Sequence, residues 1–151
     1  MSGEYRAGSG VSQGPSLAVR VRDYNGGMLG TYDVVTFVLT SEPARAKAFY
    51  GEMLGLRFVS EDDYAVVFDA HGTMLRVTAM PGHQPGQHTV LGWKVDDISA
   101  TVSVLTKAGV TFERYSFLEQ DEAGIWSPPG SGAKVAWFKD PDGNVLSLSQ
   151  H

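Results

Sequence analysis

The segment that decides the fold reads DVVTFVLTSEPARAKAFYGEMLG and spans residues 33–55. It begins with a run rich in β-branched residues, Val34–Thr40, that favours a strand. Ser41 can cap a helix, and Pro43 is tolerated in the first helical turn. Apolar residues then recur at helical spacing, and Gly55 suits the left-handed conformation that ends many helices. The segment therefore predicts a strand followed directly by a helix that lays one apolar face on a sheet.

Three more segments of strand length follow this helix, and residues that favour turns separate them. They are Leu56–Ser60, Tyr64–Ala70 and Thr73–Met80. Residues 33–80 therefore predict one βαβββ module.

The same order returns after a connector rich in Pro and Gly at residues 81–87. The segment HTVLGWKVDDISATVSVLTKAG, residues 88–109, offers a strand, the helix cap Asp96-Asp97, a helix, and Gly109 as its stop. Such self-similarity within one short chain indicates an internal duplication. Residues 88–151 therefore predict a second βαβββ module.

The second module continues with a strand at Val110–Tyr115 and ends in a hairpin around the turn Asp140–Asn144. The strands of this hairpin are expected at Val135–Phe138 and Val145–Ser149. Between strand and hairpin lies a long acidic loop, residues 116–132, with a tryptophan in its middle. Loops of this length in a small domain are often functional, so we consider it a candidate lid.

The N-terminal region precedes both modules. Residues 1–15 are rich in Gly and Ser and predict a flexible tail. Residues 16–32 combine the alternating run Leu17–Arg22 with Asn25-Gly26-Gly27, which predicts an extra strand and a turn. We expect one domain overall.

Composition narrows the class of protein. The 151 residues are 42% hydrophobic and 11% aromatic, enough for a folded core. A net charge of -5 without any Lys/Arg cluster argues against nucleic acid and anionic membrane as partners. The chain has no cysteine, so a metal would need His, Asp, Glu or water as ligands. No apolar run reaches the length of a membrane span, and we expect a cytoplasmic protein.

Five short motifs occur in an order and spacing that resemble a known family. They are Ala46–Tyr50, Leu54–Leu56, Val95–Asp97, Ala108–Val110 and Asp140–Asn144. In these motifs the chain resembles the vicinal-oxygen-chelate family of glyoxalases, bleomycin resistance proteins and extradiol dioxygenases, from about Val34 to the C-terminus. The resemblance implies an α+β fold in which two tandem βαβββ modules form curved mixed sheets around a cleft, and it implies a homodimer.

The resemblance also implies where a metal would bind. In that family a divalent metal is held by a His or Gln from the first strand and a Glu from the last strand of each module. Carried over position by position, these sites fall on Val35, Arg76, Val90 and Ser147. Valine has no donor atom, a serine hydroxyl is a poor ligand, and a guanidinium repels a divalent cation. We therefore expect a divergent member without a metal or other cofactor. Should the alignment be shifted, His88 is the alternative ligand.

Seven residues are candidates for lining the cleft. They are Phe37, Arg76, Lys94, Tyr115, Trp126, Trp137 and Ser147. Strand alternation places Arg76 on the cleft face as a cation that awaits an anion, although an internal ion pair or a solvent-facing register would also account for it. Lys94 is either a second cation in the cleft or a lysine that extends along the end of its strand into water.

Other side chains have competing interpretations. Trp126 lies in mid-loop and meets either the cleft or a second subunit, whereas alternation predicts that Trp93 packs in the core. The acidic run Glu119–Glu122 offers a general acid or base, or is a solvated face.

We expect a metal-independent protein that binds a small organic molecule in an aromatic-lined cleft, with no catalytic residue assigned. Two alternatives remain open from the sequence. One is a glyoxalase-like lyase or extradiol-type dioxygenase that depends on a divalent metal. The other is a metal-free accessory enzyme that works by acid–base chemistry.

Overall fold

The structure is a computed structural model and describes residues 28–151. The flexible tail predicted for residues 1–15 and the extra strand predicted around residues 17–22 lie outside the described residues. The end of that segment, Leu29–Thr31, forms a turn of 3-10 helix. The chain then passes into the first of two sheets.

Sheet A is formed by the first module. Its strands are β1 (Val35–Thr40), β2 (Arg57–Glu61), β3 (Ala65–Ala70) and β4 (Thr73–Ala79). The strand order is β1-β4-β3-β2, with β1 parallel to β4 and the other pairs antiparallel. A parallel neighbour for β1 requires a crossover, and the helix after β1 begins it.

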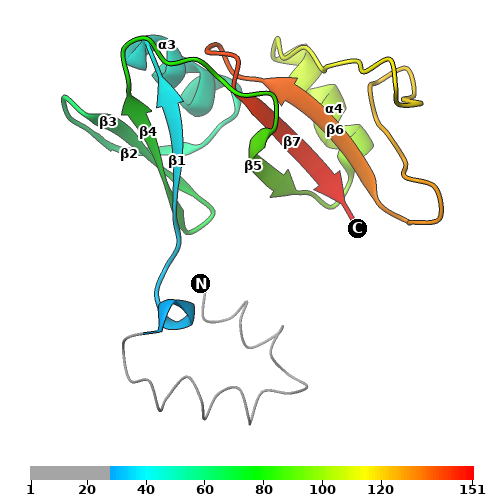
Figure 1. Ribbon diagram of the computed structural model, residues 1–151, viewed down its shortest axis with the longest axis horizontal. Coiled ribbons are helices and arrows are strands. Elements are labelled where there is room, and N and C mark those ends of the chain that lie inside the picture. Colours follow the sequence, from blue (N-terminus) through cyan, green and yellow to red (C-terminus); the bar gives the residue numbers. More distant parts are fainter. Residues whose placement is uncertain (1–27) are drawn as a thin grey trace.

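Sheet B is formed by the second module. Its strands are β5 (Thr89–Lys94), β6 (Lys134–Lys139) and β7 (Val145–Gln150), in the order β5-β7-β6 with β5 parallel to β7. Figure 1 shows the two sheets side by side, and they touch where β1 approaches β5. The predicted α+β architecture of two related modules is confirmed.

The predicted strand at Val110–Tyr115 is wrong. The segment pairs with β6 only through an isolated bridge between Phe112 and Phe138 and a hydrogen bond from the Glu113 amide to the Trp137 carbonyl. It cannot extend along β6 because Trp126 bridges Val135 further along the same edge. The long loop therefore takes the place of the rest of a fourth strand.

A helix packs on one face of each sheet. In the first module α3 (Pro43–Ala48) continues as the π-helix η3 (Phe49–Met53), and in the second α4 spans Ile98–Lys107. Gly55 and Gly109 follow these helices with φ of 79° and 108°, the left-handed conformation expected of them. Figure 1 shows α4 behind β6 and β7.

One predicted cap is present and the other is not. The Asp97 carboxylate accepts a hydrogen bond from the Ala100 amide at the start of α4, as predicted. Ser41 does not cap α3, because its hydroxyl donates to the Asp142 carboxylate at 2.8 Å. A residue from the second module thus replaces the local interaction expected from the sequence.

The core is a single cluster that joins the helices to one face of both sheets. Its largest fully buried side chains include Tyr50, Phe68, Phe138 and Leu146. Trp93 packs against it and stacks on Phe138 with ring centroids 6.4 Å apart, which confirms the core position predicted for that tryptophan. The opposite faces of both sheets do not take part in this core cluster.

The turn between β6 and β7 fastens the second module to the first. The Asp140 carboxylate is buried and accepts hydrogen bonds from the Tyr50 hydroxyl at 2.7 Å, from the Asp142 and Asn144 amides, and from the Asn144 side chain. The Asn144 side-chain amide also donates to the Leu39 carbonyl. Buried polar groups are stabilising only when they are hydrogen-bonded, and each of these has partners across the module boundary.

Asp142 makes a second set of contacts with the first module. Its carboxylate accepts hydrogen bonds from the Thr40 hydroxyl at 2.6 Å and from the Ser41 amide at 2.9 Å, and it forms an ion pair with Arg45. Burial disfavours the ionised form, but the hydrogen bonds from Thr40 and Ser41 outweigh it and hold the pKa of Asp142 below its ordinary value.

His83, in the connector between the modules, is half-buried against the same turn. Its Nε2 lies 2.7 Å from the Asn144 side-chain oxygen. The connector between the modules is therefore part of this network.

Within residues 28–151 no helix has the length and apolar character needed to cross a membrane.

Replacing Tyr50 by Phe removes one hydrogen bond to a buried carboxylate, so we expect the free energy of unfolding to fall by about 2 kcal/mol. Urea unfolding followed by circular dichroism measures the change. Tyr64→Phe is the matched control, because Tyr64 is 73% exposed and should change by less than about 0.5 kcal/mol. Equal effects of the two substitutions would show that the hydrogen bond from Tyr50 to Asp140 does not stabilise the fold.

Asp142 should make stability depend on pH. Because its pKa is lower in the folded chain than in the unfolded chain, its contribution is present above the ordinary carboxyl pKa and is lost as the pH falls through the lowered one. Between about pH 6 and about pH 3 we expect the wild type to lose more unfolding free energy than Asp142→Asn. The exposed Asp96→Asn control should follow the wild type. A wild-type pH dependence in Asp142→Asn would contradict the assignment.

Candidate functional site

The face of sheet A that does not contact the helix carries two of the predicted residues side by side. Phe37 on β1 and Arg76 on β4 are direct partners in the parallel register, although 39 positions separate them in the sequence. Val38, Leu75 and Val77 point the other way, into the core. We call this surface, formed by alternate residues of β1 and β4 such as Val35, Phe37, Met74 and Arg76, the open face of sheet A.

Arg76 is a half-buried cation without an ion-pair partner within residues 28–151. Its cross-strand neighbours are the Phe37 ring and Val67, neither of which offers a charge. The pKa of Asp62 is lowered by hydrogen bonds from the Tyr64 and Ala65 amides, and the charge of Arg76 adds to this lowering from a distance. The internal ion pair considered from the sequence is therefore absent.

A buried polar atom without a partner lies on the same face, two residues beyond Arg76. Thr78 Oγ1 has no hydrogen bond in the part of the chain that the structure describes. Unsatisfied buried hydroxyls are uncommon in native proteins and call for a specific explanation. Together with Arg76, this atom makes the open face of sheet A richer in unsatisfied polar groups than the core face.

The corresponding face of sheet B carries more of the predicted residues. Trp137 on β6 is the direct partner of Ser147 on β7, and Lys94 on β5 is the partner of Ser149. Phe138 and Leu146 point to the opposite side, into the core. Trp137, Ser147 and Lys94 thus share what we call the open face of sheet B.

Trp137 is one of four aromatic rings that gather on this side of sheet B. The ring of Tyr115 lies 5.5 Å from that of Trp137 in an edge-to-face arrangement, Trp126 lies 6.0 Å from it, and Phe117 lies 5.6 Å from Tyr115. We call Tyr115, Phe117, Trp126 and Trp137 the aromatic group. Phe117, 80% exposed, was missed by the sequence analysis, and its position two residues after Tyr115 was the available signal. Such rings offer flat apolar surface to a ligand.

Tyr115 contributes a hydroxyl group to the aromatic group. Partial burial raises the pKa of Tyr115, and the negative charge of Glu113 adds to the effect. The Tyr115 hydroxyl therefore stays protonated at neutral pH and can donate to a ligand.

The loop that carries Trp126 is fastened rather than free. The Gln120 side-chain amide donates to the Glu113 and Gly124 carbonyls, and its oxygen accepts from the Tyr115 amide at 2.7 Å. Arg114 donates to the carbonyls of Asp121 and Glu122, both at 2.6 Å. The candidate lid is thus held in place over residues 113–126.

The acidic run Glu119–Glu122 serves this loop. The Asp121 carboxylate accepts hydrogen bonds from the Ala123 and Ile125 amides, and both Glu119 and Glu122 are exposed. No contact places any of these carboxylates near Arg76 or Ser147. The run is accounted for by loop structure and solvation.

The residues at the implied metal positions do not fit a metal. Val35 shares the open face of sheet A with Arg76, and Ser147 lies beside Gly92 on sheet B. A bulge in β5 displaces Val90 from the ladder. Within residues 28–151 there is no group of three or more His, Asp or Glu that could hold a metal ion, and His88 is exposed. The donor set is thus unsuited to a divalent cation.

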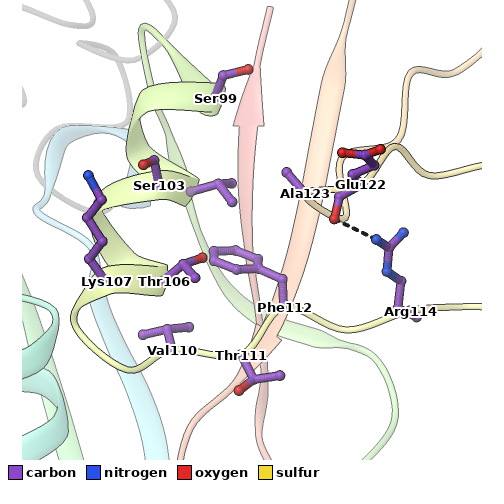
Figure 2. Close-up of a pocket in the computed structure, with 11 residues that line it drawn as sticks. Ser99, Ser103, Thr106, Lys107, Val110, Thr111, Phe112, Arg114, Glu122 and Ala123 are labelled. Atoms are coloured by element: carbon purple, nitrogen blue, oxygen red, sulfur yellow. Dashed lines mark hydrogen bonds between the residues drawn. The ribbon is translucent and has the colours of Figure 1, made fainter.

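A cavity of about 490 Å³ lies elsewhere, between α4 and the segment that replaces the fourth strand (Figure 2). Ser103, Thr106 and Lys107 line it from α4, and Phe112, Arg114 and Glu122 line it from the other side. It contains none of the seven predicted residues. The dashed line in Figure 2 marks the hydrogen bond by which Arg114 is bound to the Glu122 carbonyl. The Arg114 guanidinium is therefore engaged in holding the loop.

Comparisons with known proteins agree with this architecture. Residues 32–148 match the family model of the Glyoxalase/Bleomycin resistance protein/Dioxygenase superfamily. No curated protein matches the sequence.

Solved structures resemble the fold at low sequence identity. A glyoxalase/bleomycin resistance protein/dioxygenase from Alicyclobacillus acidocaldarius has 14% identity and a TM-score of 0.61, over 80% of this chain and 91% of that one. A lactoylglutathione lyase from Agrobacterium tumefaciens has 18% identity and a TM-score of 0.60, over 80% and 93%. A fosfomycin resistance protein from Listeria monocytogenes has 9% identity and a TM-score of 0.63, over 78% and 91%. These similarities concern the fold alone.

Replacing Gln120 by Ala removes three hydrogen bonds that hold the loop, so we expect the Tyr115 amide to exchange its hydrogen about tenfold faster or more. Hydrogen–deuterium exchange resolved along residues 113–126 measures this. The neighbouring Glu119→Ala should leave the exchange unchanged, because Glu119 is exposed. Unchanged protection in Gln120→Ala would mean that other contacts hold the loop.

Proposed function

The chain belongs to the Glyoxalase/Bleomycin resistance protein/Dioxygenase superfamily, and we propose that it is a metal-independent protein that binds a small organic molecule. The site we propose consists of the open faces of the two sheets. The observation that carries the proposal is the aromatic group on sheet B, whose rings are gathered on the face that is not used for the core. Apolar and aromatic surface with a few polar groups is typical of small-molecule sites.

The absence of suitable ligands at the implied metal positions supports the metal-independent form of the proposal. Two valines, a serine and an arginine stand where a chelating member would need imidazole, amide or carboxylate groups. The Glu113 carboxylate beside the aromatic group pairs with Lys139 at 3.8 Å. No His, Asp or Glu is among the residues that form the aromatic group, which is why binding is preferred to acid–base catalysis.

The cavity beside α4 is a weaker candidate for the primary site. Its Arg114 guanidinium is already bound to two carbonyls, and its other lining groups are hydroxyls, exposed side chains and the apolar side chains of Val102, Val110 and Phe112. A ligand there would have to compete with the hydrogen bonds that hold the loop.

The homodimer and the cytoplasmic location expected from the sequence remain predictions. Sedimentation equilibrium tests the homodimer.

Binding can be tested with two probes of the same shape, 1-naphthoate and 1-naphthylmethanol, because either fits an aromatic site. We expect saturable quenching of tryptophan fluorescence by at least one of them, unchanged after treatment with a chelator. Trp137→Leu should weaken binding about tenfold by removing the central ring of the aromatic group. Tyr64→Leu, an exposed aromatic outside the proposed site, is the matched control.

Two results would contradict the proposal. One is stoichiometric metal in protein purified without added metal, with binding or turnover lost on chelation. The other is the absence of saturable binding for both probes.

A further inference from the structure

We propose that Arg76 is an anion-binding residue and that the ligand is an organic carboxylate with a flat apolar body. This inference rests on the proposed function, because it names the class of molecule that the open faces receive. It starts from the position of Arg76 in β4, with Phe37 as its partner on β1 and Val67 as its partner on β3.

The charges of sheet A distinguish Arg76 from the other cations of its module. Arg57 lies near the Asp69 carboxylate at 3.7 Å, and Lys47 is paired with Glu61 at 2.7 Å. Arg45 is paired with Asp142 at 3.3 Å. Within the described residues Arg76 has no such partner although it is half-buried.

Partial burial makes this lack of a partner informative. A charge that is shielded from water and not paired is unfavourable, and an incoming anion relieves the penalty. Arg57, which is more exposed at 70% of its side-chain surface, has a carboxylate nearby all the same. Among the described residues, the more exposed cation therefore has a carboxylate within ion-pair distance and the less exposed one has none, since Asp62 acts on Arg76 only from farther away.

The geometry of a guanidinium selects the class of anion. Its planar fork of N–H donors matches the two oxygens of a carboxylate, and such bidentate pairs are stronger than those formed by a single ammonium. A carboxylate bound to Arg76 would have the Phe37 ring beside it, because the two residues are cross-strand partners. Phe37 is 58% exposed, so its ring is free to contact the body of the ligand.

The same pair of probes tests this inference separately from the proposed function. The two probes share the naphthalene ring, and one carries a carboxylate where the other carries a neutral hydroxymethyl group. In the wild type we expect 1-naphthoate to bind about tenfold more tightly than 1-naphthylmethanol, and added salt to weaken only the naphthoate. Arg76→Met should lower the affinity for naphthoate to that of the alcohol and leave the alcohol unchanged. Arg76→Lys, which keeps the charge without the fork, should retain part of the preference.

Arg57→Met is the matched control, since it removes a cation from the same sheet that already has a carboxylate nearby. It should keep the wild-type ratio of the two affinities. Chemical-shift changes at the Phe37 and Arg76 amides on addition of naphthoate would place the probe.

The outcomes separate the two proposals. Equal binding of both probes by the wild type, or an unchanged ratio in Arg76→Met, overturns the role of Arg76 and leaves small-molecule binding in place. Failure of both probes to bind overturns the proposed function itself. The wild-type ratio and its salt dependence require no variant, so equal binding of the two probes overturns the role of Arg76 even if a substitution prevents folding.

Discussion

The carboxylates of Asp140 and Asp142 are the constraint on which the rest of the structure depends. The two sheets share no hydrogen-bonded ladder, so backbone pairing between strands does not fix one module against the other. The turn does this instead, by bringing two acidic side chains to Tyr50, Thr40 and Ser41 of the first module. Ionised acceptors make stronger hydrogen bonds than neutral ones, which suits a few contacts that must hold two halves together.

Duplication has left the two modules with different surfaces. Sheet A has four strands and, on its open face, a cation that has no ion-pair partner among residues 28–151. Sheet B has three regular strands, and the loop that takes the place of the rest of the fourth brings Trp126 to the edge of β6. Because loss of a strand frees chain for a loop, the aromatic group is a direct result of the difference between the modules. In the ligand that we propose, the apolar part would contact aromatic rings and the anionic part would contact Arg76.

The sequence predicted well those features that depend on neighbours along the chain. The strand after Asp33, the ends of the helices at Gly55 and Gly109, and the cap at Asp97 follow from local sterics and periodicity. The cap at Ser41 failed because Asp142, 101 positions away, takes its hydroxyl. The strand at Val110–Tyr115 failed because its pairing depends on how much of the β6 edge remains free.

The candidate site was predictable only in part for the same reason. Alternation within a strand gave the faces of Phe37, Arg76 and Trp93, but the register that makes Phe37 and Arg76 neighbours depends on a pairing across 39 positions. The contacts of Gln120 with Glu113 and Gly124 depend on the path of the loop, which no periodic pattern encodes. The cavity beside α4 was missed because it exists only where an expected strand is absent.

The turn at Asp140–Asn144 also affects the angle between the two modules. The modules meet through side chains and not through a shared sheet, so the angle between the two open faces depends on the hydrogen bonds of this turn together with the shared core. A substitution in the turn can therefore change the shape of the site without altering any residue that lines it. Substitution of Asp140 or Asn144 is therefore a way to change the size of the ligand that the proposed site accepts, while Arg76 and the aromatic group stay unchanged.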